Sequence, residues 1–146
     1  MSAPVIVELP AKRVVGCVVI SSMDPNLCPS AWDMFVPRMS EVNVEGECFG
    51  VARWDYPGLS EGYFAYIAAF ESSMNPPEGM EAWDVPSGQY ARVEVPNLEA
   101  IRSTIDWFHG EWLPASGFAK GSGPYLELYP ETFPASPEFS LLFSVE

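Results

Sequence analysis

The chain repeats itself at an interval of about 76 residues, and this repeat limits the possible folds more than any other feature. Three strand-like segments of the first half have counterparts in the second half, in the same order. The pairs are Leu9–Ile20 with Val85–Val95, Phe49–Ala52 with Tyr125–Leu128, and Tyr63–Glu71 with Phe139–Glu146, at offsets of 76, 76 and 75. Identity within each pair is low, so a chance likeness between strand patterns is the alternative. The shared order favours duplication.

The repeat predicts an α+β fold in which two β-α-β-β modules are related by a pseudo-twofold axis. The first module covers about residues 4–73 and the second about 79–146, and the turn-rich segment Pro76–Gly79 joins them. We expect one domain, residues 1–146, with an antiparallel sheet, two main helices and a central ligand cleft. A chain of 146 residues with 48% hydrophobic side chains can build such a core.

Two apolar stripes at helical spacing predict the helices. Ser30 can cap the first helix, which Pro37 should kink or break, and Asn97 can cap the second, which Pro114 should end. The stripes are Trp32, Phe35, Met39 and Val42 in the first helix, and Leu98, Ile101, Ile105, Phe108 and Trp112 in the second. Stripes of this kind are more often core than ligand site.

Alternation with a period of two predicts which side chains share a face of each strand. In the segment Tyr125–Tyr129 the two leucines lie on one face, and Glu127 lies on the other face between two tyrosines. In the segment Phe64–Phe70 the aromatic residues Phe64, Tyr66 and Phe70 share a face.

The charge excludes some partners. Seven basic residues stand against 20 acidic ones, which gives a net charge of −13. Nucleic acids and anionic membranes are therefore not expected as direct partners, because both need clustered Lys and Arg. Cationic partners are favoured, although acidity that only aids solubility is the simpler explanation.

The sequence has few residues that could bind a metal ion or act as a catalytic nucleophile. The only histidine is His109, and the three cysteines, Cys17, Cys28 and Cys48, form no C-x-x-C pair. We therefore assign no metal site and no cofactor. The start lacks the pattern of a secretory signal, no apolar run approaches membrane-helix length, and odd, scattered cysteines fit a reducing cytoplasm, so a cytoplasmic location is expected.

Four segments together resemble the GyrI-like, AraC-type effector-binding domains, a family of small-molecule sensors. They are Phe49–Val51, Gly79–Ala91 (GMEAWDVPSGQYA), Trp112–Phe118 (WLPASGF) and Tyr125–Tyr129 (YLELY). They follow the family's order, and the resemblance extends over about residues 4–146.

The resemblance implies duplicated β-α-β-β modules with a ligand cleft between them. It implies lipophilic, often cationic ligands, and it places the family's cation-contacting carboxylate on Glu127. In transcription factors this domain is fused to a helix-turn-helix reader. No reader is found here, so we expect a standalone binding module in the manner of multidrug-binding domains, without direct DNA contact.

Glu127 among aromatic rings is the predicted centre of the ligand site, since a cation can relieve the cost of burying a lone carboxylate. A solvated strand face is the alternative for Glu127, and plain core is the alternative for Phe35 and Trp112. The predicted ligand-binding residues are Glu127, Tyr129, Tyr125, Tyr66, Phe70, Phe35 and Trp112, and none is predicted to be catalytic.

Two other functions stay open at this point. One is a hydrolase for electrophilic natural products on the same scaffold, in which Glu127 activates water and Glu111 assists. The other is an acidic protein that binds a basic surface, such as that of gyrase. Exposed sheet edges also permit a homodimer.

Overall fold

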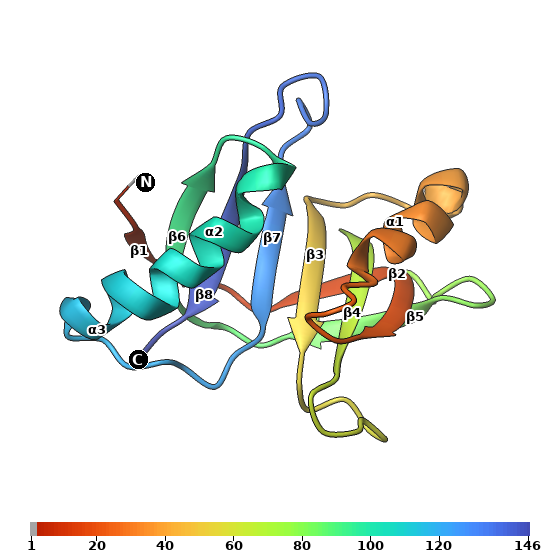
Figure 1. Ribbon diagram of the computed structural model, residues 1–146. Coiled ribbons are helices and arrows are strands. Elements are labelled where there is room, and N and C mark those ends of the chain that lie inside the picture. Colours follow the sequence, from red (N-terminus) through yellow and green to blue (C-terminus); the bar gives the residue numbers. More distant parts are fainter. Residues whose placement is uncertain (1–2) are drawn as a thin grey trace.

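The computed structural model describes residues 3–146, and its centre is one antiparallel sheet of eight strands with helices on one face (Figure 1). The strands are β1 (Val5–Leu9), β2 (Lys12–Ser21), β3 (Cys48–Arg53), β4 (Phe64–Glu71), β5 (Glu81–Val85), β6 (Gly88–Val95), β7 (Tyr125–Tyr129) and β8 (Phe139–Ser144). The helices are α1 (Cys28–Phe35), η1 (Val36–Glu41), η2 (Leu98–Ala100), α2 (Ile101–Trp107), η3 (Phe108–Trp112) and α3 (Leu113–Ser116).

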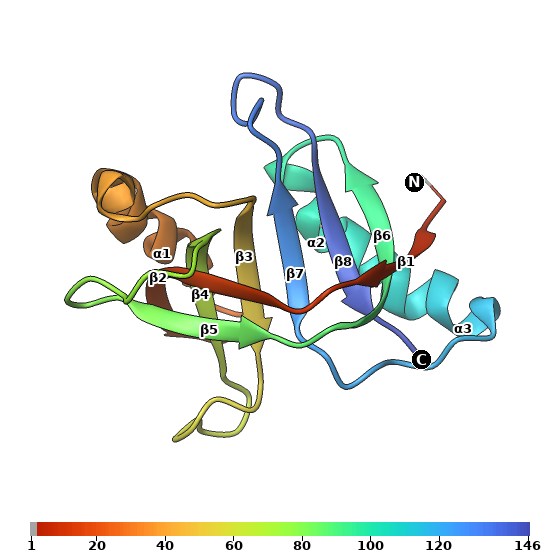
Figure 2. The same cartoon turned by 180° about the vertical axis from the view of Figure 1, so that it is seen from behind.

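The strand order confirms the predicted duplication. The strand order is β1-β6-β8-β7-β3-β4-β2-β5. The counterparts in the two halves are β1 and β5, β2 and β6, β3 and β7, and β4 and β8. Exchanging each strand for its counterpart gives the same order read from the other end, as a twofold axis requires. Each module carries one strand more than predicted, because β1 and β5 precede the expected units. Each extra strand pairs with the other half, β1 with β6 and β5 with β2, which ties the two modules together (Figure 2).

The register refines the predicted offsets. Gly50 of β3 lies opposite Glu127 of β7, so the pseudo-twofold axis passes between these two strands and exchanges these positions, 77 residues apart. Val19 pairs with Tyr66, and its counterpart Val95 pairs with Phe139. Tyr66 therefore corresponds to Phe139 at an offset of 73, and the predicted offset of 75 for this strand pair was wrong.

The first helical segment behaves as its prolines predict. α1 ends at Phe35 and continues as the 3₁₀ turn η1, which has Pro37 in its first turn, so the expected break is confirmed. Helix α1 begins at Cys28, and the side chain of Ser30 bonds back to the carbonyl of Leu27 instead of capping the backbone N–H groups.

The second helical segment departs from the prediction at its end. Asn97 caps it as expected, since its side chain accepts the N–H of Ala100 at 3.1 Å. Pro114 does not end it, because the π-helical turn η3 precedes it and Pro114 occupies the first turn of α3, where a missing N–H costs little. The segment ends at Gly117, which has φ of 84°.

Both faces of the sheet are covered at its centre. On one face β1 and β5 help to enclose a core that includes Phe49, Ile67 and Leu126. On the other face α1 and α2 each cover an apolar cluster, centred on Phe35 and Phe108 respectively. Within residues 3–146, no helix is long and apolar enough to span a bilayer. The two central strands, β3 and β7, lie between the parts of the sheet that α1 and α2 cover.

Candidate functional site

Glu127 lies at the centre of the sheet, on the face that the helices cover. Alternation along β7 turns Leu126 to the opposite core and Glu127 to the helical side, and the side chain is only 6% exposed. Across the strand pair stands Gly50, and a Cβ at that position would collide with the Tyr66 hydroxyl and the Glu127 carboxylate. The glycine therefore makes room for the acid.

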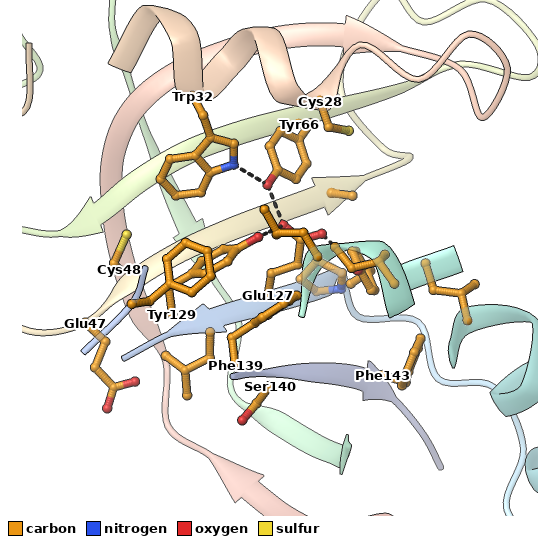
Figure 3. A pocket seen from close by; sticks show the side chains of 18 of the residues that line it. Cys28, Trp32, Glu47, Cys48, Tyr66, Glu127, Tyr129, Phe139, Ser140 and Phe143 are labelled. Carbon is orange, nitrogen blue, oxygen red and sulfur yellow. Dashed lines mark hydrogen bonds between the residues drawn. The ribbon is translucent and has the colours of Figure 1, made fainter. Parts of the chain in front are cut away.

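Three phenol groups donate hydrogen bonds to this carboxylate (Figure 3). Tyr66 donates to Oε1 at 2.5 Å, Tyr129 donates to Oε1 at 3.0 Å, and Tyr125 donates to Oε2 at 2.9 Å. The Tyr66 hydroxyl in turn accepts a hydrogen bond from the indole Nε1 of Trp32 at 2.8 Å. A chain of donors thus runs from α1 through β4 to the acid on β7.

Burial and hydrogen bonding have opposite effects on the acidity of Glu127. Burial raises the pKa of Glu127, and the three phenol donors counteract only part of that effect. Burial next to this acid also raises the pKa of Tyr66 and Tyr125 well above the ordinary range, so both phenols are neutral donors. Among residues 3–146, none of the ion pairs involves Glu127. Its charge is hydrogen-bonded but not neutralised.

A cleft of about 1580 Å³ opens over this acid, between the helical layers of the two halves. The indole of Trp32 lies edge-on to the ring of Tyr129 at 5.2 Å, and Phe133, from the loop after β7, lies 4.9 Å from Tyr129 on another side. Aromatic and acidic side chains that line it include Trp32, Phe70, Tyr66, Tyr125, Glu127, Tyr129, Phe133, Phe139 and Phe143. These rings therefore surround one buried charge, and the other charged side chains of the lining are exposed.

Five of the seven predicted residues come together here: Glu127, Tyr125, Tyr129, Tyr66 and Phe70 all line the cleft.

Phe35 and Trp112, also predicted as ligand-binding residues, do not line the cleft. Phe35 is fully buried beneath α1, where it packs against Phe70 at 5.1 Å. Trp112 stacks between Phe108 and Phe118, at 5.1 and 6.3 Å. Both rings serve the core. Glu111, the suggested assisting acid, is exposed and also lies outside the lining.

The aromatic lining residues that were not predicted from the sequence include Trp32, Phe133, Phe139 and Phe143. The spacing of apolar residues places Trp32 in a helical stripe. A buried indole N–H needs a hydrogen-bond acceptor, and this requirement could have indicated a polar partner such as Tyr66. Phe133 lies in an irregular loop, where no periodicity shows which way a ring points.

The cleft offers no metal or thiolate chemistry. Residues 3–146 contain no group of three metal-binding side chains. Cys28 and Cys48 line the cleft, but burial raises the pKa of each thiol to about 12, so both stay protonated.

The family model described as "Integron-associated effector binding protein" (Cass2) matches residues 5–145. The chain belongs to this family. Membership confirms the predicted GyrI-like relationship and identifies a small-molecule-binding, effector-type module. As a Cass2 protein, the chain is 27% identical over 134 residues to the transcriptional regulator BrlR of Pseudomonas aeruginosa. The match covers 88% of this chain and 48% of BrlR, so the chain spans about half the length of this curated relative.

Solved structures share the fold of this chain. The structure of SAV2435 bound to tetraphenylphosphonium aligns with a TM-score of 0.76 and 14% identity, covering 99% of this chain and 94% of the other. An integron cassette protein of Vibrio cholerae aligns at 0.71 and 18% identity, covering 99% and 96%. A transcription-regulation protein of Staphylococcus aureus MU50 aligns at 0.74 and 14% identity, covering 98% and 97%.

Proposed function

We propose that this protein binds lipophilic cations in the cleft between its halves, with Glu127 as the charge that attracts them. The observation that carries the proposal is a buried carboxylate, 6% exposed, that opens on an aromatic cleft and makes no ion pair within residues 3–146. Removing a carboxylate from water is unfavourable, and a bound cation offsets that cost in a medium of low dielectric constant.

The aromatic walls suit the non-polar part of such a ligand. Each ring that faces a cation adds about 0.5–2 kcal/mol of attraction. Tyr66, Tyr125 and Tyr129 contact the acid directly, and Trp32 contacts Tyr66. A cleft with few polar anchors tolerates ligands of different shape. The fold neighbour bound to tetraphenylphosphonium supports this ligand class.

Binding is favoured over hydrolysis because hydrogen bonds from the protein already use most of the acceptor positions of Glu127. A general base needs a free lone pair within hydrogen-bond reach of the attacking water. Three phenols already donate to Glu127 and leave about one acceptor position, and the assisting acid that hydrolysis would require, Glu111, is not beside it. We therefore treat Glu127 as an electrostatic anchor.

Titration with tetraphenylphosphonium, followed by tryptophan fluorescence, tests the proposal. We expect saturable binding, and at least about tenfold weaker binding by Glu127→Gln, since a lost charge interaction of about 1.4 kcal/mol has that effect. Neutral triphenylphosphine oxide is the uncharged comparison ligand, and its binding should not weaken in Glu127→Gln. The variant Glu111→Gln removes an exposed charge outside the cleft and should bind like the parent. Absence of saturable binding, or equal affinity in Glu127→Gln, would overturn the proposal.

A further inference from the structure

We infer that the cleft discriminates between cations by the number of N–H groups they carry, and that Tyr125 is a determinant of this specificity. Permanently charged cations without N–H groups should bind better than ammonium ions with the same rings. The inference rests on the proposed function and deepens it.

The acceptor sites of Glu127 are nearly used up by the protein itself. A carboxylate offers about four lone-pair positions. Oε1 accepts two hydrogen bonds, from Tyr66 and Tyr129, and Oε2 accepts one, from Tyr125. About one position, on Oε2, is left for a ligand. The site therefore supplies negative charge but little hydrogen-bonding capacity.

Few other strong acceptors lie near the acid. Every fully buried side-chain nitrogen or oxygen atom among residues 3–146 already has a partner, and the Tyr66 oxygen accepts from Trp32. The phenol oxygens are neutral and therefore weaker acceptors than a carboxylate. The lining includes six other acids, all of them exposed to water: Asp33, Glu47, Glu94, Glu99, Glu131 and Glu138.

These contacts have opposite consequences for two kinds of cation. An ammonium ion with two N–H groups gives up its hydrogen bonds to water and recovers only one strong bond at Oε2. A quaternary ammonium or phosphonium ion has no such bonds to lose, and the charge of Glu127 still attracts it. The penalty should appear when the second N–H group is added.

A ligand series tests the inference at constant charge and constant ring content. Its members are dibenzyldimethylammonium, N-methyldibenzylammonium and dibenzylammonium, with zero, one and two N–H groups. Isothermal titration calorimetry at neutral pH should give a loss of about tenfold between the first and the last. Added methyl groups also favour the first member through the hydrophobic effect, so the ratio in the parent protein alone does not decide the matter.

The variant Tyr125→Phe decides it, because it frees a lone pair on Oε2 and retains the ring. The contribution of the methyl groups is unchanged, so the affinity ratio between the first and last ligands should shrink by about tenfold. Tyr63→Phe is the matched control: Tyr63 is 45% exposed and lies outside the cleft, and this variant should keep the parent ratio. Tyr129→Phe, which frees a lone pair on Oε1, replaces Tyr125→Phe if the latter does not fold.

The results separate this inference from the function on which it rests. An unchanged ratio in Tyr125→Phe, or in Tyr129→Phe where that variant replaces it, overturns the inference and leaves the cation site standing. If none of the three ammonium ions nor tetraphenylphosphonium binds, the proposed function falls, and the inference falls with it. A ratio that shrinks in the tyrosine variants but not in Tyr63→Phe supports the inference.

Discussion

Glu127 is the only acidic residue among residues 3–146 that is buried, and its protonation state sets the chemistry of the cleft. Burial raises its pKa from an ordinary 4.5, so the acid takes up a proton at a higher pH in the folded chain than in the unfolded chain. The proposed ligands carry a permanent charge and do not titrate. The pH response of binding therefore belongs to the protein.

We predict that affinity for tetraphenylphosphonium falls as the pH is lowered through the raised pKa of Glu127, because the protonated acid no longer attracts the cation. Calorimetric titrations between pH 8 and pH 4.5 measure this effect, and Glu127→Gln should remove it. His109 also lines the cleft and has a pKa lowered by burial and by Lys120, so it needs a control of its own. The exposed acids of the lining are present in both the parent and Glu127→Gln, so the comparison of the two accounts for them. A pH response that persists in Glu127→Gln and vanishes in His109→Gln would contradict the assignment.

The same shift predicts how the stability of the ligand-free protein depends on pH. Between 4.5 and the raised pKa the folded state binds the Glu127 proton more tightly than the unfolded state does. The contribution of Glu127 to the free energy of unfolding is therefore largest below 4.5 and declines as the pH rises through the raised pKa. Urea denaturation of the parent and of Glu127→Gln across this range should diverge in that direction, and the opposite slope would show that the pKa is lowered by folding.

The indole of Trp32 gives a second prediction for single side chains. Its Nε1 donates to the Tyr66 hydroxyl at 2.8 Å, which in turn donates to Glu127. A double-mutant cycle with Trp32→Phe and Tyr66→Phe should give a coupling of about 0.5–1.5 kcal/mol in the free energy of unfolding. Additive effects would show that the two side chains act independently.

The elements show what the sequence could predict and what it could not. Alternation along β7 placed Glu127 between Tyr125 and Tyr129 correctly, because a strand fixes side chains at a period of two. The direction of the helical side chains was harder to predict, because Trp32 and Phe35 belong to one stripe and lie less than one helical turn apart. Only packing against β4 decides that Phe35 enters the core while Trp32 reaches the cleft.

The central strand pair supplies a test at the level of elements. Gly50 of β3 leaves the space that the Tyr66 hydroxyl and the Glu127 carboxylate occupy. We predict that Gly50→Ala lowers the free energy of unfolding by about 1–3 kcal/mol through overpacking, and weakens cation binding as well. Thermal denaturation and titration measure the two effects.

Gly110→Ala is the control for this substitution. A Cβ at Gly110 meets no atom within 4 Å, and alanine suits a helical segment better than glycine. Its stability should be equal to or above that of the parent. If Gly50→Ala behaves like Gly110→Ala, the close packing at the strand pair is not what shapes the site.

For the whole molecule, the repeat in the sequence predicted the duplicated architecture, but the exchange of β1 and β5 was not foreseen. These strands have five residues each, and each pairs with a strand of the other half. A local sequence pattern therefore could not predict their partners. The duplication is broken at the site itself. Glu127 has Gly50 as its counterpart, and Tyr66 has Phe139, so the two halves together build one acidic site.

The net charge of −13 adds a long-range effect that salt should separate from the local one. Raising the ionic strength from about 0.05 M to 0.5 M shortens the screening length, so the affinity for a cation should fall in both the parent and Glu127→Gln. Because a buried charge is screened much less, the ratio of the two affinities should stay nearly constant. A ratio that collapses toward one at high salt would mean that Glu127 acts only as part of the surface charge.

A crystal structure of the complex with tetraphenylphosphonium tests the central claim most directly. We predict that the phosphorus atom lies over the Glu127 carboxylate, within about 6 Å of the ring of Trp32 or Tyr129, at the distance typical of cation–π contacts. A cation bound away from the cleft at full occupancy, or an empty cleft at saturating ligand, would contradict the account.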